Sequence, residues 1–127
     1  MSIMHVQVTD RAQWNDTLAR LPNAHVLQSW EWGEFKNRWG WTVDRLLWRR
    51  QNRVVGAAQV LTRPVPRTPW QFMYLSKGPA LDYTDIPLTE MILADLERLG
   101  QQSRSLFIKI DPDVVRQSGE PGLSLIH

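Results

Sequence analysis

One segment, from residue 25 to residue 41, constrains the fold of this chain more than any other. It holds four of the seven tryptophans, and Ser29 is a residue type that caps helix N-termini, so we predict a helix from there through Trp39. Trp32, Phe35 and Trp39 recur at i, i+3 and i+7, which places them on one helical face. Such a face either anchors a helix in the core or lines a site. We predict that these aromatics anchor the helix, with Lys36 on the flank of the stripe.

The rest of the chain alternates between strand and helix patterns. Predicted strands cover residues 6–8, 41–50, 54–63, 72–76 and 106–110. Predicted helices cover residues 10–20, 29–39 and 88–105. Three prolines between positions 63 and 70 lack the amide donors that a sheet requires, so the second and third long strands are separated there. The order predicts one α/β (α+β) domain with a mixed, mostly antiparallel sheet flanked by helices.

Composition excludes several classes of protein. A net charge of +2 does not suit a dedicated DNA-binding protein, and the lack of cysteine removes disulfides, thiol nucleophiles and Cys-ligated zinc. No apolar run reaches the roughly 20 residues that span a bilayer, and no signal peptide is visible, so we expect a cytoplasmic location. His5, His25 and His127 show neither metal-ligand spacing nor a Ser and Asp partner, so we assign no metal and no catalytic triad.

The run Arg53-Val54-Val55-Gly56-Ala57-Ala58 matches the pattern with which GNAT-type acetyltransferases hold the pyrophosphate of acetyl-CoA. That pattern requires a loop that opens a helix, whose N-terminal amides face the anion. Here the run lies in a predicted strand, with Pro64 and Pro66 following. We therefore assign no cofactor site and expect Gly56 to serve a bulge or close packing.

Three motifs occur in a fixed order: Leu27-Gln28-Ser29-x-x-Trp32-x-x-x-Lys36-x-x-x-Gly40-Trp41, Tyr74-Leu75-Ser76-Lys77-Gly78-Pro79-Ala80-Leu81-Asp82 and Phe107-Ile108-Lys109-Ile110-Asp111-Pro112. Together they span about residues 25–112 and resemble the FemABX family. Members of that family are peptidyltransferases that build the interpeptide bridge of bacterial peptidoglycan. The resemblance implies a GNAT-like fold, present as two domains in tandem with the substrate cleft between them.

The resemblance also implies a reaction. An amino acid passes from aminoacyl-tRNA to the stem peptide of a UDP-linked or lipid-linked muropeptide, close to the membrane, with neither metal nor CoA. By position in the motifs, Lys36 contacts the diphosphate of the precursor, and an ammonium is a suitable point charge for phosphate. Asp82 lies near the acceptor and is the one catalytic candidate, while Lys77 is a candidate for substrate binding or a structural role. Trp32 and Tyr74 are implied to be scaffold.

Family chains are more than twice as long as this one. Residues 1–127 are therefore expected to be a partial first GNAT-like domain, incomplete at its C-terminus, with the second domain absent and no activity on its own. Two other functions stay open. One is a GNAT-type N-acyltransferase that uses acyl-CoA, which rests on fold analogy alone. The other is a binding module without chemistry, in which Leu123, Leu125 and Ile126 mediate association.

Overall fold

The computed structural model describes the backbone of residues 3–75 and 77–110, and the side chains as far as residue 106. The elements in chain order are β1 (Ile3–Gln7), α1 (Arg11–Arg20), the 3-10 turn η1 (Val26–Gln28), α2 (Trp30–Arg38), β2 (Thr42–Arg50), β3 (Arg53–Pro64), β4 (Gln71–Leu75), β5 (Ala80–Leu81), α3 (Ile86–Gln102) and β6 (Ser105–Ile110). Two predicted features, the Asp111-Pro112 strand end and the association residues Leu123, Leu125 and Ile126, lie outside the described residues.

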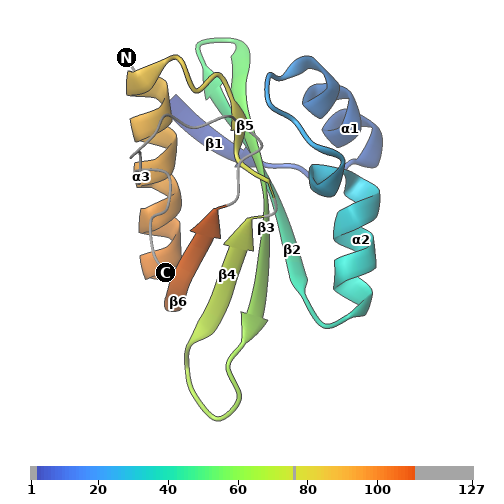
Figure 1. The fold of residues 1–127 in the computed structure, drawn as a ribbon, viewed down its shortest axis with the longest axis vertical. Coiled ribbons are helices and arrows are strands. Elements are labelled where there is room, and N and C mark those ends of the chain that lie inside the picture. Colours follow the sequence, from blue (N-terminus) through green and yellow to red (C-terminus); the bar gives the residue numbers. More distant parts are fainter. Residues whose placement is uncertain (1–2, 76, 111–127) are drawn as a thin grey trace, which may run out of the picture.

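The strands form one six-stranded sheet. Five of them follow the order β1-β2-β3-β4-β6, and the short β5 pairs with Gly56 and Ala57 of β3, away from the residues of β3 that pair with β4. All pairs are antiparallel except β4 and β6. Helix α3 covers one face of the sheet, and α1 and α2 cover the other (Figure 1). The mixed, mostly antiparallel sheet between helices is therefore confirmed, whereas β5 was not predicted. The long helix also ends at Gln102 rather than at residue 105.

Alternate residues of the central strands pack into two separate hydrophobic cores, one on each face of the sheet. Leu46 and Trp48 of β2 face α3, and Leu47 between them faces α1, as the period-two geometry of a strand requires. Gly56 of β3 lets α3 approach closely, because a Cβ at this position would lie 2.6 Å from Ile92 Cδ1. A register shift also occurs opposite it, next to Trp48. Both parts of the prediction for Gly56 are therefore confirmed.

A buried carboxylate ties α3 to the sheet. Asp95 Oδ2 accepts a hydrogen bond from Trp48 Nε1 at 2.8 Å and lies 2.7 Å from His5 Nδ1, while Arg98 pairs with the other oxygen. Burial alone raises the pKa of the Asp95 carboxyl, but the hydrogen bonds from Trp48 and His5 outweigh it and hold that pKa below its usual value. Because β1, β2 and α3 all contribute to this cluster, it fixes the helix over the two strands.

The aromatic stripe of α2 does not face the core, so that prediction was wrong. Trp39 is 65% exposed and Phe35 is 46% exposed, while Trp32 is half-buried. The buried residue of α2 is Gly33, whose absent Cβ would lie 2.5 Å from both Arg45 Nη2 and Gln59 Oε1. The sheet presents polar side chains beneath α2, so the helix packs there through its smallest residue and its aromatic face turns outward.

Candidate functional site

Lys36 lies in the last turn of α2, which begins at a cap made by Ser29. The Ser29 hydroxyl accepts a hydrogen bond from the Trp32 amide at 3.2 Å, as predicted for an N-cap. Gly40 has φ 94°, in the left-handed region that favours glycine, and it turns the chain after the helix. The Trp41 amide then donates to the Lys36 carbonyl at 3.3 Å. The helix end and the turn together bring Trp41 back beside Lys36.

Two cations lie within 6 Å of the centroid of the Trp41 ring, and we call Lys36 and Arg63 the cation pair. Lys36 Nζ lies 5.7 Å from the Trp41 ring centroid and 5.6 Å from that of Trp32. Arg63 Cζ lies 5.4 Å from the Trp41 centroid, and its Nη2 donates to the Trp39 carbonyl at 3.2 Å. Within the described part of the chain, neither cation is paired with a carboxylate. The arrangement suits a diphosphate, since a guanidinium binds phosphate oxygens as a fork and an ammonium as a point charge.

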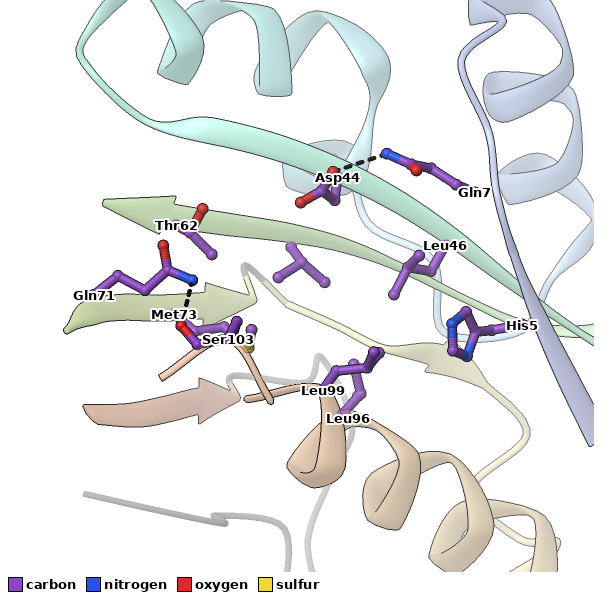
Figure 2. Close-up of a pocket in the computed structure, with 11 residues that line it drawn as sticks. His5, Gln7, Asp44, Leu46, Thr62, Gln71, Met73, Leu96, Leu99 and Ser103 are labelled. Carbon is purple, nitrogen blue, oxygen red and sulfur yellow. Dashed lines mark hydrogen bonds between the residues drawn. The ribbon is translucent and has the colours of Figure 1, made fainter. Parts of the chain in front are cut away.

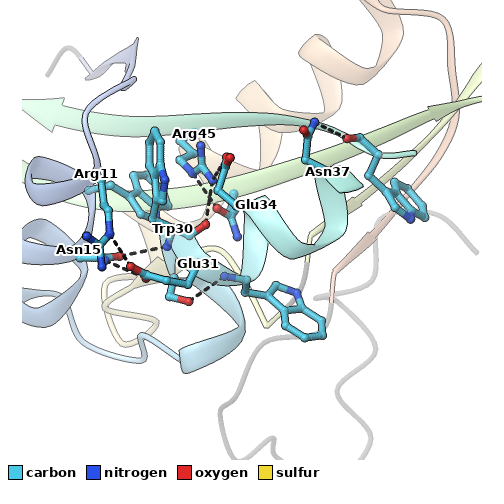
Figure 3. Close-up of polar contacts among 12 residues, drawn as sticks. Arg11, Asn15, Trp30, Glu31, Glu34, Asn37 and Arg45 are labelled. Atoms are coloured by element: carbon cyan, nitrogen blue, oxygen red, sulfur yellow. Dashed lines mark hydrogen bonds and ion pairs between the residues drawn. The ribbon is translucent and has the colours of Figure 1, made fainter. Parts of the chain in front are cut away.

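A buried arginine fixes α2 on the sheet and so positions Lys36. Arg45 donates to Gln59 Oε1 at 2.8 Å and to the Trp30 carbonyl at 3.0 Å, and it stacks 3.6 Å from the Trp30 ring centroid. Its Nη2 also lies 3.3 Å from Glu34 Oε2 (Figure 3). Burial lowers the pKa of the Arg45 guanidinium, and the hydrogen bond with Glu34 opposes that shift. Sequence reasoning missed this residue, although a lone arginine between predicted core positions of a strand was a visible signal.

Polar contacts at its first turn attach α2 to α1. Asn15 Oδ1 accepts from the Trp30 amide at 3.0 Å, and Asn15 Nδ2 donates to Glu31 Oε1 at 3.0 Å (Figure 3). Arg11 Nε donates to the other oxygen of Glu31. The hydrogen bond from Asn15, with that from Arg11, holds the pKa of Glu31 below its usual value. Helix α2 is thus held at both its start and its middle, while its last turn presents Lys36.

Asp82 and Lys77 belong to the connection from β4 through β5 to α3. Asp82 is exposed, and its Oδ1 accepts from the Thr84 hydroxyl at 2.6 Å and the Thr84 amide at 3.0 Å. These hydrogen bonds hold the pKa of Asp82 below its usual value, so the carboxylate is ionised at neutral pH. Lys77 has φ 54° and precedes the buried residues Gly78 and Pro79. The Pro79 carbonyl accepts from the Tyr83 hydroxyl, which closes the turn.

The structure does not bring Lys36 and Asp82 together. Thr42, which follows Trp41, pairs with Thr62 of β3, whereas Leu81, which precedes Asp82, pairs with Gly56 of the same strand. These rows are six residues apart on β3, which is about 20 Å at about 3.3 Å per residue. Lys77 lies between them, after the end of β4. A single ligand reaches both Lys36 and Asp82 only if it is extended.

Asp82 also lines a hollow of about 220 Å³ with Arg20, Arg50, Arg53 and Asp85. Arg50 Nη1 lies 3.4 Å from Asp85 Oδ2, so the positive charge of Arg50 is partly balanced by this carboxylate. Arg53 opens β3, which continues to Pro64, and the run from Arg53 to Ala58 therefore opens no helix. The prediction that this run lies in a strand is confirmed.

A larger cavity of about 470 Å³ lies on the face of the sheet that α3 covers, between the strands and the end of this helix (Figure 2). Its wall is largely apolar, and its polar groups include Asp44, which accepts from Gln7 Nε2 at 2.8 Å, and His5 beside Asp95. No lysine or arginine lines it. It therefore does not suit a diphosphate, and the cation pair is the better candidate site.

Neither a metal site nor a membrane-spanning helix occurs among the residues that the structure describes. No group of three or more His, Cys, Asp or Glu side chains there is placed to hold a metal ion. Across residues 3–75 and 77–110, no helix is both long and apolar enough to cross a lipid bilayer.

Comparisons with known proteins agree with the motifs and the fold. The model of the FemAB family matches residues 11–122. A "Lipid II:glycine glycyltransferase" of Staphylococcus saprophyticus is 32% identical over 120 residues, which are 94% of this chain and 28% of that protein. A protein of the same name from Staphylococcus aureus is 33% identical over 102 residues, 80% of this chain and 24% of the relative. The chain thus spans about a quarter of the length of these relatives.

Solved structures place the fold. The crystal structure of FemX superposes with a TM-score of 0.76 at 30% identity, over 90% of this chain and 28% of that one. A GNAT family acetyltransferase of Staphylococcus aureus superposes with a TM-score of 0.60 at 16% identity, over 94% of this chain and 97% of that one. The second match shows the fold alone, and with the first it confirms the GNAT-like architecture. On the family model, the relatives and the FemX structure together, the chain belongs to the FemAB family.

Proposed function

We propose that this chain is the first GNAT-like domain, in part, of a cytoplasmic aminoacyltransferase that extends the stem peptide of a peptidoglycan precursor. The acceptor is a muropeptide carried on a diphosphate, and the donor is an aminoacyl-tRNA. The relatives are named for glycine transfer to lipid II, which supports a lipid-linked acceptor. They are more than three times as long as this chain, so the remaining substrate and catalytic groups are expected in a second domain.

The observation that carries the proposal is the cation pair on Trp41. Lys36 and Arg63 come from α2 and β3, and both lie within 6 Å of one indole ring. The ring shields one side of each charge from water, which strengthens its attraction for a phosphate. Arg63 is an addition to the expected site. We assign the two phosphates of the precursor to Lys36 and Arg63 together.

Asp82 fits a role at the other end of the same ligand. A muropeptide carries its diphosphate and its peptide on opposite sides of a sugar, so an extended precursor bound at Lys36 can reach a residue about 20 Å away. In the reaction the acceptor amine attacks the ester carbonyl of the charged tRNA, an amide bond forms, and the tRNA hydroxyl leaves with a proton. A carboxylate whose pKa is low is a weak base. We therefore assign Asp82 to binding the acceptor ammonium, with Lys77 nearby, and not to proton abstraction.

The test is a calorimetric titration of the chain with a UDP-linked muropeptide. Lys36→Ala and Arg63→Ala each remove a charged partner worth about 1.5–3 kcal/mol, so affinity is expected to fall about 10- to 100-fold. Arg49→Ala, an exposed arginine of β2 away from the site, is the control and is expected to bind like the wild type. Equal affinity in all four proteins would show that the cation pair does not hold the precursor.

The acyl-CoA alternative is separated by a thermal-shift measurement. A ligand of the folded state raises the melting temperature, so CoA at millimolar concentration is expected to leave it unchanged. A reproducible increase that Arg53→Ala abolishes would favour the acetyltransferase function instead.

A further inference from the structure

The two segments that carry the cation pair are rich in basic residues. Residues 35–43 and 60–75 contain four cations and no aspartate or glutamate, although the net charge of the whole chain is only +2. The four are Lys36, Arg38, Arg63 and Arg67. The C-terminal end of α2 and the hairpin between β3 and β4 lie at the same end of the sheet (Figure 1). The charge of the chain is therefore concentrated at this end.

The same surface exposes large aromatic side chains. Trp39 is 65% exposed, Phe35 46% and Trp70 44%. Phe35 is stacked on Trp32 with ring centroids 5.4 Å apart, and its centroid lies 6.3 Å from that of Trp39. These contacts make the aromatics of α2 continuous with the rings that hold Lys36.

Trp70 joins this surface from the hairpin. Its carbonyl accepts from the Val65 amide at 3.0 Å, one step beyond the pair formed by Pro64 and Gln71. Arg63 pairs with Phe72, and residues two apart on a strand share a face, so Trp70 lies on the side of the sheet that carries Arg63. We call Phe35, Trp39 and Trp70, with the four cations, the docking surface.

We propose that the docking surface binds the surface of an anionic lipid bilayer. Indole rings favour the interface between water and lipid, because one part of the ring is apolar and the N–H is polar. Arginine and lysine beside them are attracted by anionic headgroups, and no carboxylate in these two segments opposes that attraction. The combination favours a charged lipid surface over an uncharged apolar protein partner, for which four cations would be costly to bury.

The test is sedimentation of the chain with vesicles of phosphatidylcholine alone or with 30% phosphatidylglycerol. We expect binding to the anionic vesicles only, weakened as NaCl rises from 0.1 to 0.5 M. The double variant Trp39→Ala/Trp70→Ala is expected to lose at least tenfold in binding. Ile86→Ala, which removes a 58% exposed apolar side chain elsewhere, is the matched control and should bind like the wild type.

Two results would overturn the docking surface: no sedimentation of the wild type with anionic vesicles, or equal binding by the double variant and the control. Titration with the soluble UDP-linked precursor separates this outcome from the proposed function. The double variant is expected to keep wild-type affinity for the soluble precursor, because Trp39 and Trp70 lie outside the cation pair. Vesicle binding with no effect of Lys36→Ala or Arg63→Ala on precursor affinity would instead refute the proposed function and leave the docking surface standing.

Discussion

Replacing Gly33 by alanine tests whether α2 is held in place by close packing on the sheet. On an exposed helix, the change from glycine to alanine stabilises by about 1 kcal/mol. Here the new Cβ would lie 2.5 Å from Arg45 Nη2, 2.5 Å from Gln59 Oε1 and 2.8 Å from Gln59 Cδ. Either α2 moves away from the sheet or the hydrogen bond between Arg45 and Gln59 breaks, so the sign of the effect is expected to reverse.

The magnitude follows from these contacts. Overpacking costs about 1–3 kcal/mol, and a hydrogen bond that involves a charged group is worth about 1.5–3 kcal/mol. Because only one of these costs is incurred, and the helix-propensity gain of about 1 kcal/mol offsets part of it, we expect Gly33→Ala to lower the free energy of unfolding by about 1 kcal/mol. Urea denaturation followed by far-UV circular dichroism measures it. Gln13→Ala, on the exposed side of α1, is expected to stay within about 0.5 kcal/mol of the wild type.

A double-mutant cycle identifies the cause. Gln59→Ala removes two of the three atoms nearest to the new Cβ, so Gly33→Ala should cost less in that background by about 1 kcal/mol or more. A Gly33→Ala protein as stable as the wild type would refute the packing argument. So would strict additivity with Gln59→Ala, because the cost would then have another origin.

Two further substitutions test the anchoring of α3. Asp95→Asn weakens the bonds from Trp48 and His5 and is expected to cost about 1–3 kcal/mol at neutral pH. The pKa of Asp95 is lower in the folded than in the unfolded protein, so the ionised carboxylate adds to the free energy of unfolding above the unfolded pKa of about 4. This stabilisation is lost as the pH falls through the folded pKa, and the wild type and Asp95→Asn should then become equally stable. A difference in stability that does not depend on pH would contradict this. Gly56→Ala places a Cβ 2.6 Å from Ile92 Cδ1 and is expected to cost about 1–3 kcal/mol in urea denaturation, with Ile92→Val in the same background restoring part of it.

Periodicity predicted α3 and the buried face of α1 correctly but misplaced the face of α2. Trp14 and Leu18 are four residues apart, a spacing that predicts a shared buried face, and both are buried because the sheet beneath α1 is apolar. Spacing shows which residues share a helical face and does not show what that face meets. Beneath α2 the sheet carries Arg45 and Gln59, and the helix therefore turned its glycine inward.

The motifs supplied Lys36, whereas Arg63 required the structure. Counting outward from the pair Arg50 and Arg53 places Thr42 opposite Leu61, and strand alternation then puts Arg63 on the α3 face. The register shift next to Trp48 moves the partner of Thr42 to Thr62 and brings Arg63 to the face of Trp41. Gly56 indicated a bulge as one of two possibilities, but the sequence did not show that the extra residue would decide which face of the sheet carries Arg63.

Helices α2 and α3 are secured by different kinds of contact, and this has a consequence for motion. Helix α3 buries seven residues, including Leu88, Ile92, Leu93 and Leu96, whereas α2 buries only Gly33 and is held mainly by hydrogen bonds. Few buried apolar contacts mean a small free energy for local opening. Amide protons of α2 should therefore exchange with solvent faster than those in the middle of α3. Lys36 then sits on a helix that opens more readily than α3, while the strand that carries Arg63 stays in place, so the spacing of the two cations can adjust as a ligand arrives.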